Sequence, residues 1–183
     1  STIEGDISIT RNFALTSLDG LNNLTSITGE LIIGEYDSWM FYGNPLLSNL
    51  AALNKLTFVG GDVTISDNDA LTSPDGLESL TSIGGDVTIS ENDALTSLDG
   101  LESLTSIGGG LRIGGYNWLK GERYGNDALT SLMGLDSLTS IGEYLSIDFN
   151  DSLTSLMGLD ILTSIGGGVV IRGNDALPNL MGL

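Results

Sequence analysis

Residues 61–84, GDVTISDNDALTSPDGLESLTSIG, are followed directly by residues 85–108, GDVTISENDALTSLDGLESLTSIG. These two stretches differ at only two positions, so the chain repeats with a period of 24 residues. A unit of this size cannot bury its own apolar side chains, and stacked units must share one core, as in solenoid proteins. Aligning the remaining sequence gives six turns and a partial seventh, with strands expected to start at Ile7, Leu31, Val63, Val87, Leu111, Leu145 and Val169.

Two apolar spacings occur within each unit. Val87 and Ile89 alternate with Thr88 and Ser90, which is typical of a strand with one face turned inward. Aliphatic residues then recur at every third position, a spacing that fits an angular coil better than a helix or a strand: Leu95, Leu98, Leu101, Leu104 and Ile107. We therefore predict an all-β solenoid of about seven turns, with parallel strands about 4.8 Å apart.

Two columns of equivalent residues are expected to support this scaffold. One asparagine follows each strand and can satisfy backbone groups where the chain leaves the sheet. These residues are Asn12, Asn44, Asn68, Asn92, Asn126, Asn150 and Asn174. A second column marks a corner with almost no room for a side chain. It consists of Gly20, Ala52, Gly76, Gly100, Gly134, Gly158 and Gly182.

The composition excludes several classes of function. With 24 acidic and 6 basic residues, the net charge of −18 disfavours nucleic acids and anionic membrane surfaces as partners. The chain has no cysteine or histidine, which excludes disulfides, a Ser-His-Asp triad and the usual zinc sites. No apolar run is long enough for membrane insertion. Because the acidic residues recur as copies in each turn and no distinct pair stands out, we predict that the protein is not an enzyme.

The segment LTSIGGDVTISENDALTSLDGLESL resembles the leucine-rich repeat, and more closely its receptor L-domain version with the pattern GLxxLxxIxGxLxIxxNxxL. The resemblance covers essentially the whole chain, residues 1–183. It implies a right-handed parallel β-helix in an extracellular or cell-surface module for ligand binding or adhesion. Because the flanking cysteines of animal receptor domains are missing, the resemblance implies a surface protein of a bacterium or a unicellular organism.

Two insertions interrupt the repeat, at residues 36–43 (YDSWMFYG) and 116–125 (YNWLKGERYG). Each separates a strand from its asparagine, so both should leave the solenoid at the same edge, three turns and roughly 14 Å apart. Aromatic side chains on loops of a rigid scaffold are typical of binding surfaces. The predicted ligand-binding residues are Tyr36, Trp39, Phe41, Tyr42, Arg112, Tyr116, Trp118, Lys120, Arg123 and Tyr124.

These two loops are expected to form a cleft that holds a glycan or a protein segment at the cell surface. Lys120 and Arg123 would then pair with a carboxylate or sulfate of the ligand. The alternative is that the loops pack on each other and on the turns between them, as an apolar cluster without a ligand. In that case the chain would be a purely structural segment of a large surface protein.

Polar residues form further columns along the repeat. Five carboxylates follow the asparagines, namely Asp69, Asp93, Asp127, Asp151 and Asp175. Each is expected to accept a hydrogen bond within its own turn, and calcium binding is the alternative, although no DxDxDG loop is present. Two threonine columns resemble ice-binding faces and make ice binding an alternative function. They are Thr25, Thr57, Thr81, Thr105, Thr139 and Thr163, and Thr16, Thr72, Thr96, Thr130 and Thr154.

One corner column changes from polar to apolar along the chain, in the order Asp19, Ala51, Asp75, Asp99, Met133, Met157, Met181. The methionines would form either an adaptable ridge at an interface or part of the core. The sequence stops partway through a turn, so we expect it to be a piece of a longer protein. Homo-association through the open ends or through the methionine ridge is a further expectation.

Overall fold

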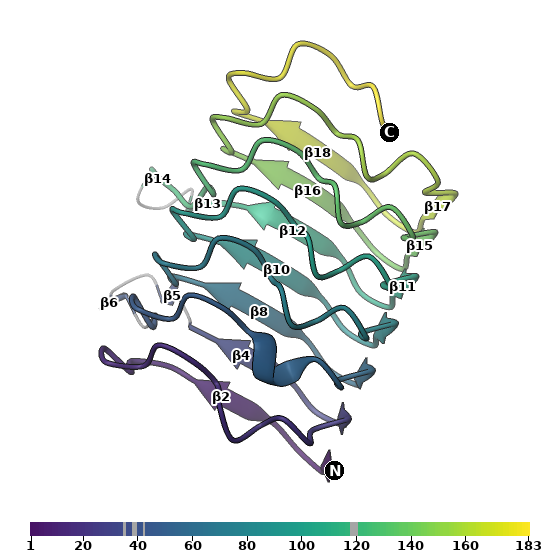
Figure 1. The fold of residues 1–183 in the computed structure, drawn as a ribbon. Coiled ribbons are helices and arrows are strands. Elements are labelled where there is room, and N and C mark those ends of the chain that lie inside the picture. Colours follow the sequence, from purple (N-terminus) through teal and green to yellow (C-terminus); the bar gives the residue numbers. More distant parts are fainter. Residues whose placement is uncertain (35, 38–39, 42, 118–120) are drawn as a thin grey trace.

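Two parallel sheets of seven strands each form the walls of a solenoid (Figure 1). The computed structural model describes residues 1–34, 36–37, 40–41, 43–117 and 121–183, with the backbone alone at 36–37, 40–41 and 117. The long-strand sheet contains β2 (Ile7–Ile9), β4 (Leu31–Ile33), β8 (Val63–Ser66), β10 (Val87–Ser90), β12 (Leu111–Gly114), β16 (Leu145–Asp148) and β18 (Val169–Arg172).

The second wall, the short-strand sheet, is built from strands of two residues. It contains β1 (Thr2–Ile3), β3 (Ser26–Ile27), β7 (Phe58–Val59), β9 (Ser82–Ile83), β11 (Ser106–Ile107), β15 (Ser140–Ile141) and β17 (Ser164–Ile165). Ile107, which the three-residue spacing placed in an angular coil, instead lies in strand β11 of this wall. A Ser-Ile pair is too short to show the alternation that predicts a strand.

The register of the long-strand sheet agrees with the alignment of the sequence. Val63 pairs with Val87, 24 residues later, whereas Leu31 pairs with Val63 and Leu111 with Leu145, across the two insertions. All seven predicted strand starts are confirmed. The insertions therefore leave the stacking of the strands unchanged.

Tight turns explain the three-residue spacing of the leucines. The backbone N–H of Leu95 donates to Asn92 O, and those of Leu101 and Leu104 donate to the carbonyls of Leu98 and Leu101. Each bond spans three residues and turns the next leucine inward, as in a single turn of 3₁₀ helix. These leucines are at most 3% exposed, so the predicted core is confirmed.

The glycine column occupies a corner where backbones of successive turns touch. Its glycines have φ between +105° and +116°, and a Cβ added at Gly76 would lie 2.0 Å from Leu50 O. Only glycine adopts this conformation without strain. At Ala52 the chain instead forms the 3₁₀ helix η1 (Ala51–Leu53), so the one alanine in the column coincides with a different local structure.

The asparagine column forms a ladder of amides inside the solenoid. Asn92 is completely buried, and its Nδ2 donates to Ile65 O at 2.9 Å and to Asn126 Oδ1 at 3.2 Å. Its Oδ1 accepts the backbone N–H of Asn68. The predicted structural role of this column is therefore confirmed.

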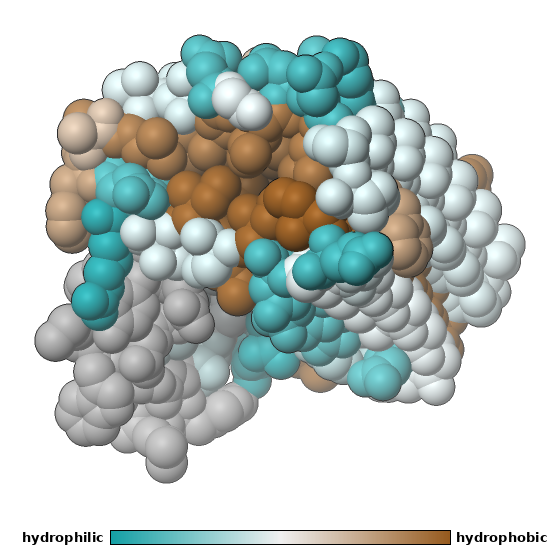
Figure 2. All heavy atoms as spheres, turned by 90° about the horizontal axis from the view of Figure 1, so that it is seen from below, coloured by the Kyte–Doolittle hydropathy of each residue, from teal (hydrophilic) through white to brown (hydrophobic). Residues whose placement is uncertain are grey.

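Apolar side chains are visible at the N-terminal end of the solenoid, inside a rim of polar residues (Figure 2). Ile7 and Ile9 of β2 are half-buried there, whereas the equivalent Ile33 and Leu31 of the next turn are fully buried. The core therefore reaches the surface at this end of the structure.

Candidate binding site

Both insertions leave the solenoid at the carboxyl ends of strands in the long-strand sheet. The first contains the antiparallel strands β5 (Tyr36–Asp37) and β6 (Met40–Phe41), and the second contains β13 (Tyr116–Asn117) and β14 (Glu122–Arg123). β4 and β12, which precede them, are separated by β8 and β10 in the sheet. The two hairpins therefore leave one edge three strand spacings apart, about 14 Å at 4.8 Å for each spacing.

Glycines stand where the second hairpin leaves and rejoins the solenoid. A Cβ on Gly114 would lie 1.9 Å from Asp148 O, and one on Gly125 would lie 1.7 Å from Phe149 O. The chain thus leaves and returns against the backbone of the next turn, where no side chain fits. This contact fixes the base of the hairpin to the scaffold.

The side chains of Arg112, Tyr116, Arg123 and Tyr124 are described, whereas those of the other predicted site residues are not. Tyr36 and Phe41 face each other as backbone partners in β5 and β6. Trp39, Tyr42, Trp118 and Lys120 lie outside the described residues.

Aromatic and guanidinium groups hold the second hairpin against the last two turns. The rings of Tyr116 and Phe149 stack with their centroids 5.1 Å apart. Arg123 lies over Phe149 at 4.9 Å, and Arg172 lies over both Phe149 and Tyr116 at 5.6 and 5.7 Å. Arg172 Nε also lies 3.0 Å from Asp148 Oδ1, as an ion pair without the geometry of a hydrogen bond. Tyr116 is therefore an anchor of the hairpin on the scaffold.

Arg112 and Tyr124 make contacts outside the cluster around Phe149, with Tyr144 and Glu122. Arg112 is exposed and lies over the ring of Tyr144 at 5.5 Å, and the hydroxyl of Tyr144 donates to Asp86 Oδ2 at 2.9 Å. Burial, together with this hydrogen bond, raises the pKa of Tyr144. The hydroxyl of Tyr124 donates to Glu122 Oε2 within the hairpin. Arg112 and Arg123 thus stack on different aromatic rings.

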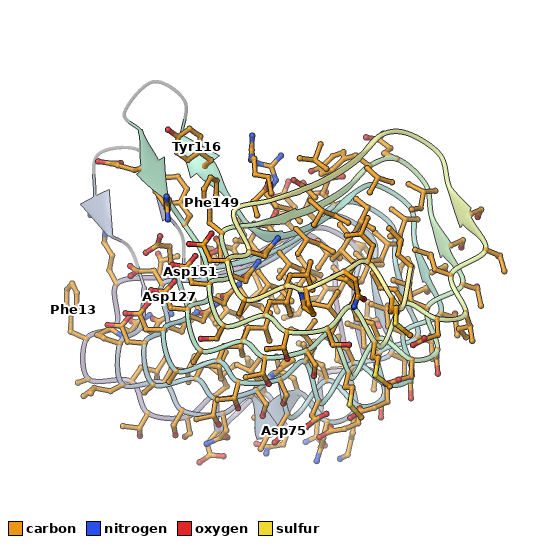
Figure 3. All side chains as sticks on the ribbon, turned by 90° about the horizontal axis from the view of Figure 1, so that it is seen from above. Phe13, Asp75, Tyr116, Asp127, Phe149 and Asp151 are labelled. Carbon is orange, nitrogen blue, oxygen red and sulfur yellow. The ribbon has the colours of Figure 1, made fainter. Side chains whose placement is uncertain are left out.

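Two adjoining hollows lie along this edge and share Glu91 and Asp93; we call them together the acidic groove. The first has a volume of about 320 Å³ and is lined by Phe13, Gly43, Pro45, Asp67, Asp69, Glu91 and Asp93. The second has a volume of about 180 Å³ and is lined by Glu91, Asp93, Arg123, Gly125, Asp127, Phe149 and Asp151. Figure 3 shows Phe13, Asp127, Asp151 and Phe149 gathered on this side of the solenoid.

Like charges in the acidic groove perturb one another. Burial raises the pKa of Glu91 to about 7, and Asp93 and Asp67 contribute further to this rise. Burial and Asp93 also raise the pKa of Asp69. The ladder of carboxylates therefore costs electrostatic energy when all of its members are ionised.

Among the described residues, Arg123 is the basic side chain that lines the groove, and it partly offsets this repulsion. Burial raises the pKa of Asp127, Asp151 and Asp93 add to the rise, and Arg123 opposes it. The expected pairing of Arg123 with an anionic ligand would thus take place beside four carboxylates of the chain itself. Among the described residues, no group of three or more carboxylates is arranged to hold a metal ion.

Phe13, Asp67, Glu91, Phe149 and Arg172 are members of the site that the sequence analysis did not single out. Asp67, Glu91 and Phe149 each directly precede a column asparagine, and their φ angles are between +54° and +58°. An aromatic residue directly before the column asparagine, in the turn that follows an insertion, is the signal that would have identified Phe149. Arg172 could not be assigned without knowing that it pairs with Asp148 across β16 and β18.

The threonine columns have a structural role. In the first column, Thr81 Oγ1 donates to Thr57 O and Thr105 Oγ1 donates to Thr81 O, both at 3.0 Å. In the second, Thr96 and Thr130 make the same contact to the preceding threonine. Each of these hydroxyl hydrogens is thus committed to a backbone carbonyl of the neighbouring turn.

Comparisons of the chain with known protein families, with curated proteins and with solved structures found no significant match. Within the described part of the chain, no helix is long and apolar enough to cross a bilayer. The functional conclusions below therefore depend on the geometry of the chain itself.

Proposed function

We propose that the protein is a non-enzymatic recognition or adhesion module at the cell surface, and that its ligand binds in the acidic groove between the two hairpins. One observation supports this most strongly: two separate insertions leave the repeat at the same edge, and a groove runs along the turns at that edge. A scaffold that needs only its core for stability does not require such projections.

The chemistry of the groove favours a glycan or an extended protein segment that carries hydrogen-bond donors or positive charge. Carboxylates such as Asp69 and Asp93 accept hydrogen bonds from sugar hydroxyls and attract ammonium or guanidinium groups. Phe13, which is 67% exposed, provides an apolar surface at one end, and Phe149 lies at the other. An anionic ligand is disfavoured by the same carboxylates.

We further propose that the solenoid is of the right-handed, leucine-rich, L-domain-like type with a 24-residue period. The parallel register, the buried leucines at every third position and the asparagine ladder support this assignment. A surface protein of a bacterium or unicellular organism is the matching context.

Two deletions remove the hairpins and leave a regular repeat. Removing residues 115–124 leaves the sequence LRIGGNDAL, which closely matches the uninterrupted VVIRGNDAL of the last turn. Removing residues 35–42 shortens the first insertion in the same way. Both deletions restore a spacing of 24 residues between successive strands.

Isothermal titration calorimetry with a defined panel tests the proposal. The panel contains a deacetylated chito-oligosaccharide, a cello-oligosaccharide, an alginate oligosaccharide and a Lys-Ser peptide. We expect the cationic ligands to bind the parent most tightly and alginate most weakly, and each deletion to weaken binding at least tenfold. Equal affinities of the parent and the double-deletion variant for every ligand of the panel would contradict the proposal.

Ice binding is the second candidate, because the threonine ladders are regular and exposed. The commitment of their hydroxyl hydrogens to backbone carbonyls makes it the weaker proposal. Thermal hysteresis of the purified protein tests it directly, and Thr81→Val with Thr105→Val removes the relevant hydroxyls.

A further inference from the structure

The methionine column forms an exposed apolar strip on another face of the solenoid. Met133, Met157 and Met181 are 50%, 53% and 74% exposed, so the sequence-based alternative of core filling is not supported. Asp75 belongs to the same column and lies at the bottom of the view in Figure 3, away from Asp127 and Asp151 of the acidic groove at the left. This methionine strip is therefore separate from the proposed ligand site.

Stacking of successive turns brings these methionines into one line. A Cβ on Gly158 would lie 3.0 Å from the backbone N of Met133, and one on Gly182 would lie 2.7 Å from that of Met157. Adjacent turns thus touch at this corner, with a spacing of about 4.8 Å between strands. Side chains on one face of a helix have a similar spacing of about 5–6 Å.

Fixed negative charge borders the methionine strip. Asp136 and Asp160 are exposed, and one oxygen of each accepts the backbone N–H of Gly134 or Gly158 at 2.9 and 3.0 Å. Asp99 continues the column in the preceding turn and is also exposed. The sequence has no lysine or arginine from residue 124 to residue 171, so no base of these turns neutralises the carboxylates.

We propose that the methionine strip binds a basic amphipathic helix of a partner protein. The apolar face of the helix would cover the flexible thioether side chains, and its lysines or arginines would lie beside Asp99, Asp136 and Asp160. A second copy of this chain is a poorer occupant, because each copy carries a net charge of −18 and would bring its own carboxylates to the contact.

The test uses an 18-residue peptide of leucine and lysine with leucines at helical spacing i, i+3, i+4 and i+7. A peptide of the same composition, with its leucines dispersed around the helix, is the control for charge. The protein is labelled with ¹³C at the methionine methyl groups, which gives four signals, from Met40, Met133, Met157 and Met181. We expect the first peptide to shift the signals of Met133, Met157 and Met181.

A double variant separates apolar docking from attraction by charge. Met133→Asp with Met157→Asp installs the residue that the same column carries at Asp75 and Asp99, so the solenoid is expected to fold unchanged. It also adds two negative charges. Apolar docking predicts at least a tenfold loss of affinity for the amphipathic peptide, whereas attraction by charge alone predicts tighter binding.

Three outcomes would overturn the proposal. Equal or tighter binding by the double variant would show that charge alone attracts the peptide. Equal binding of the two peptides would show that the apolar face is not recognised. Shifts of the Met133 and Met157 signals with protein concentration alone would assign the strip to a second copy. The affinity of the double variant is read from the signal of Met181, which lies in the same strip, so peptide bound in the acidic groove does not enter the comparison.

Discussion

Asn92 shows how single residues hold the turns together. Its side chain is completely buried and bonds to the carbonyls of Ile65 and Ser90 and to the amide of Asn126. The same pattern recurs in the neighbouring turns, so each amide satisfies backbone groups that the strands leave unpaired.

Replacing Asn92 with alanine should therefore be costly. The variant leaves buried carbonyl and N–H groups without partners, and we expect it to lose about 2–4 kcal/mol of unfolding free energy. Asn174→Ala is the matched control, because that side chain is only partly buried and water can replace its bonds. Urea denaturation of both variants checks this prediction, and an equal loss in the two would contradict it.

Glu91 makes the stability of the fold dependent on pH. Its pKa rises from an ordinary value of 4.5 to about 7 on folding, so the folded state binds more protons than the unfolded state between these values. Stability should consequently fall as pH rises from about 4.5 to 7 and remain low above 7.

Glu91→Gln should stabilise the protein at pH 8 and reduce the difference in melting temperature between pH 5 and pH 8. The melting temperature of this variant will still depend partly on pH, because the pKa values of Asp69 and Asp127 are also raised. Glu143→Gln, which removes an exposed charge outside the groove, is the control. Equal effects of the two substitutions would show that Glu91 does not cause the dependence.

Among the elements, the strands of the long-strand sheet could be predicted from the sequence, whereas those of the short-strand sheet could not. Val87 and Ile89 are buried on either side of half-buried Thr88, whereas Ser106–Ile107 has too few residues to show a pattern. The location of the hairpins also followed from the sequence, because each interrupts an otherwise regular repeat. The stacking of Tyr116 on Phe149 did not, since it joins residues from successive turns.

The hairpins should be dispensable for folding. Deleting residues 115–124 restores the 24-residue spacing and removes the contacts of Tyr116 with Phe149 and Arg172, while the core leucines remain. We expect a cooperative thermal transition within a few degrees of that of the parent, followed by circular dichroism. Loss of the cooperative transition would show that the hairpin is part of the scaffold.

At the scale of the whole molecule, the net charge of −18 opposes compaction. Aspartates stacked in successive turns concentrate that charge at one edge. Salt shortens the range of this repulsion, from about 30 Å at 0.01 M to about 3 Å at 1 M. The melting temperature should therefore rise over this range of NaCl concentration.

Melting temperatures measured in CaCl₂ at the same ionic strengths distinguish screening of the carboxylates from specific binding of calcium. We expect the two salts to raise the melting temperature equally. A larger rise in CaCl₂ would show that calcium binds specifically, and a fall of the melting temperature in NaCl would contradict the repulsion between carboxylates.

The most direct test of the proposed ligand site is a reversal of charge within the groove. Asp93 lines both hollows, whereas Asp175 occupies the same ladder in the last turn and lines neither of them. Calorimetric titration of Asp93→Lys and Asp175→Lys with the chito-oligosaccharide and with alginate compares the two positions. We expect Asp93→Lys alone to weaken binding of the cationic ligand by about tenfold and to strengthen binding of alginate. Equal effects of the two substitutions, or none, would contradict binding in the acidic groove.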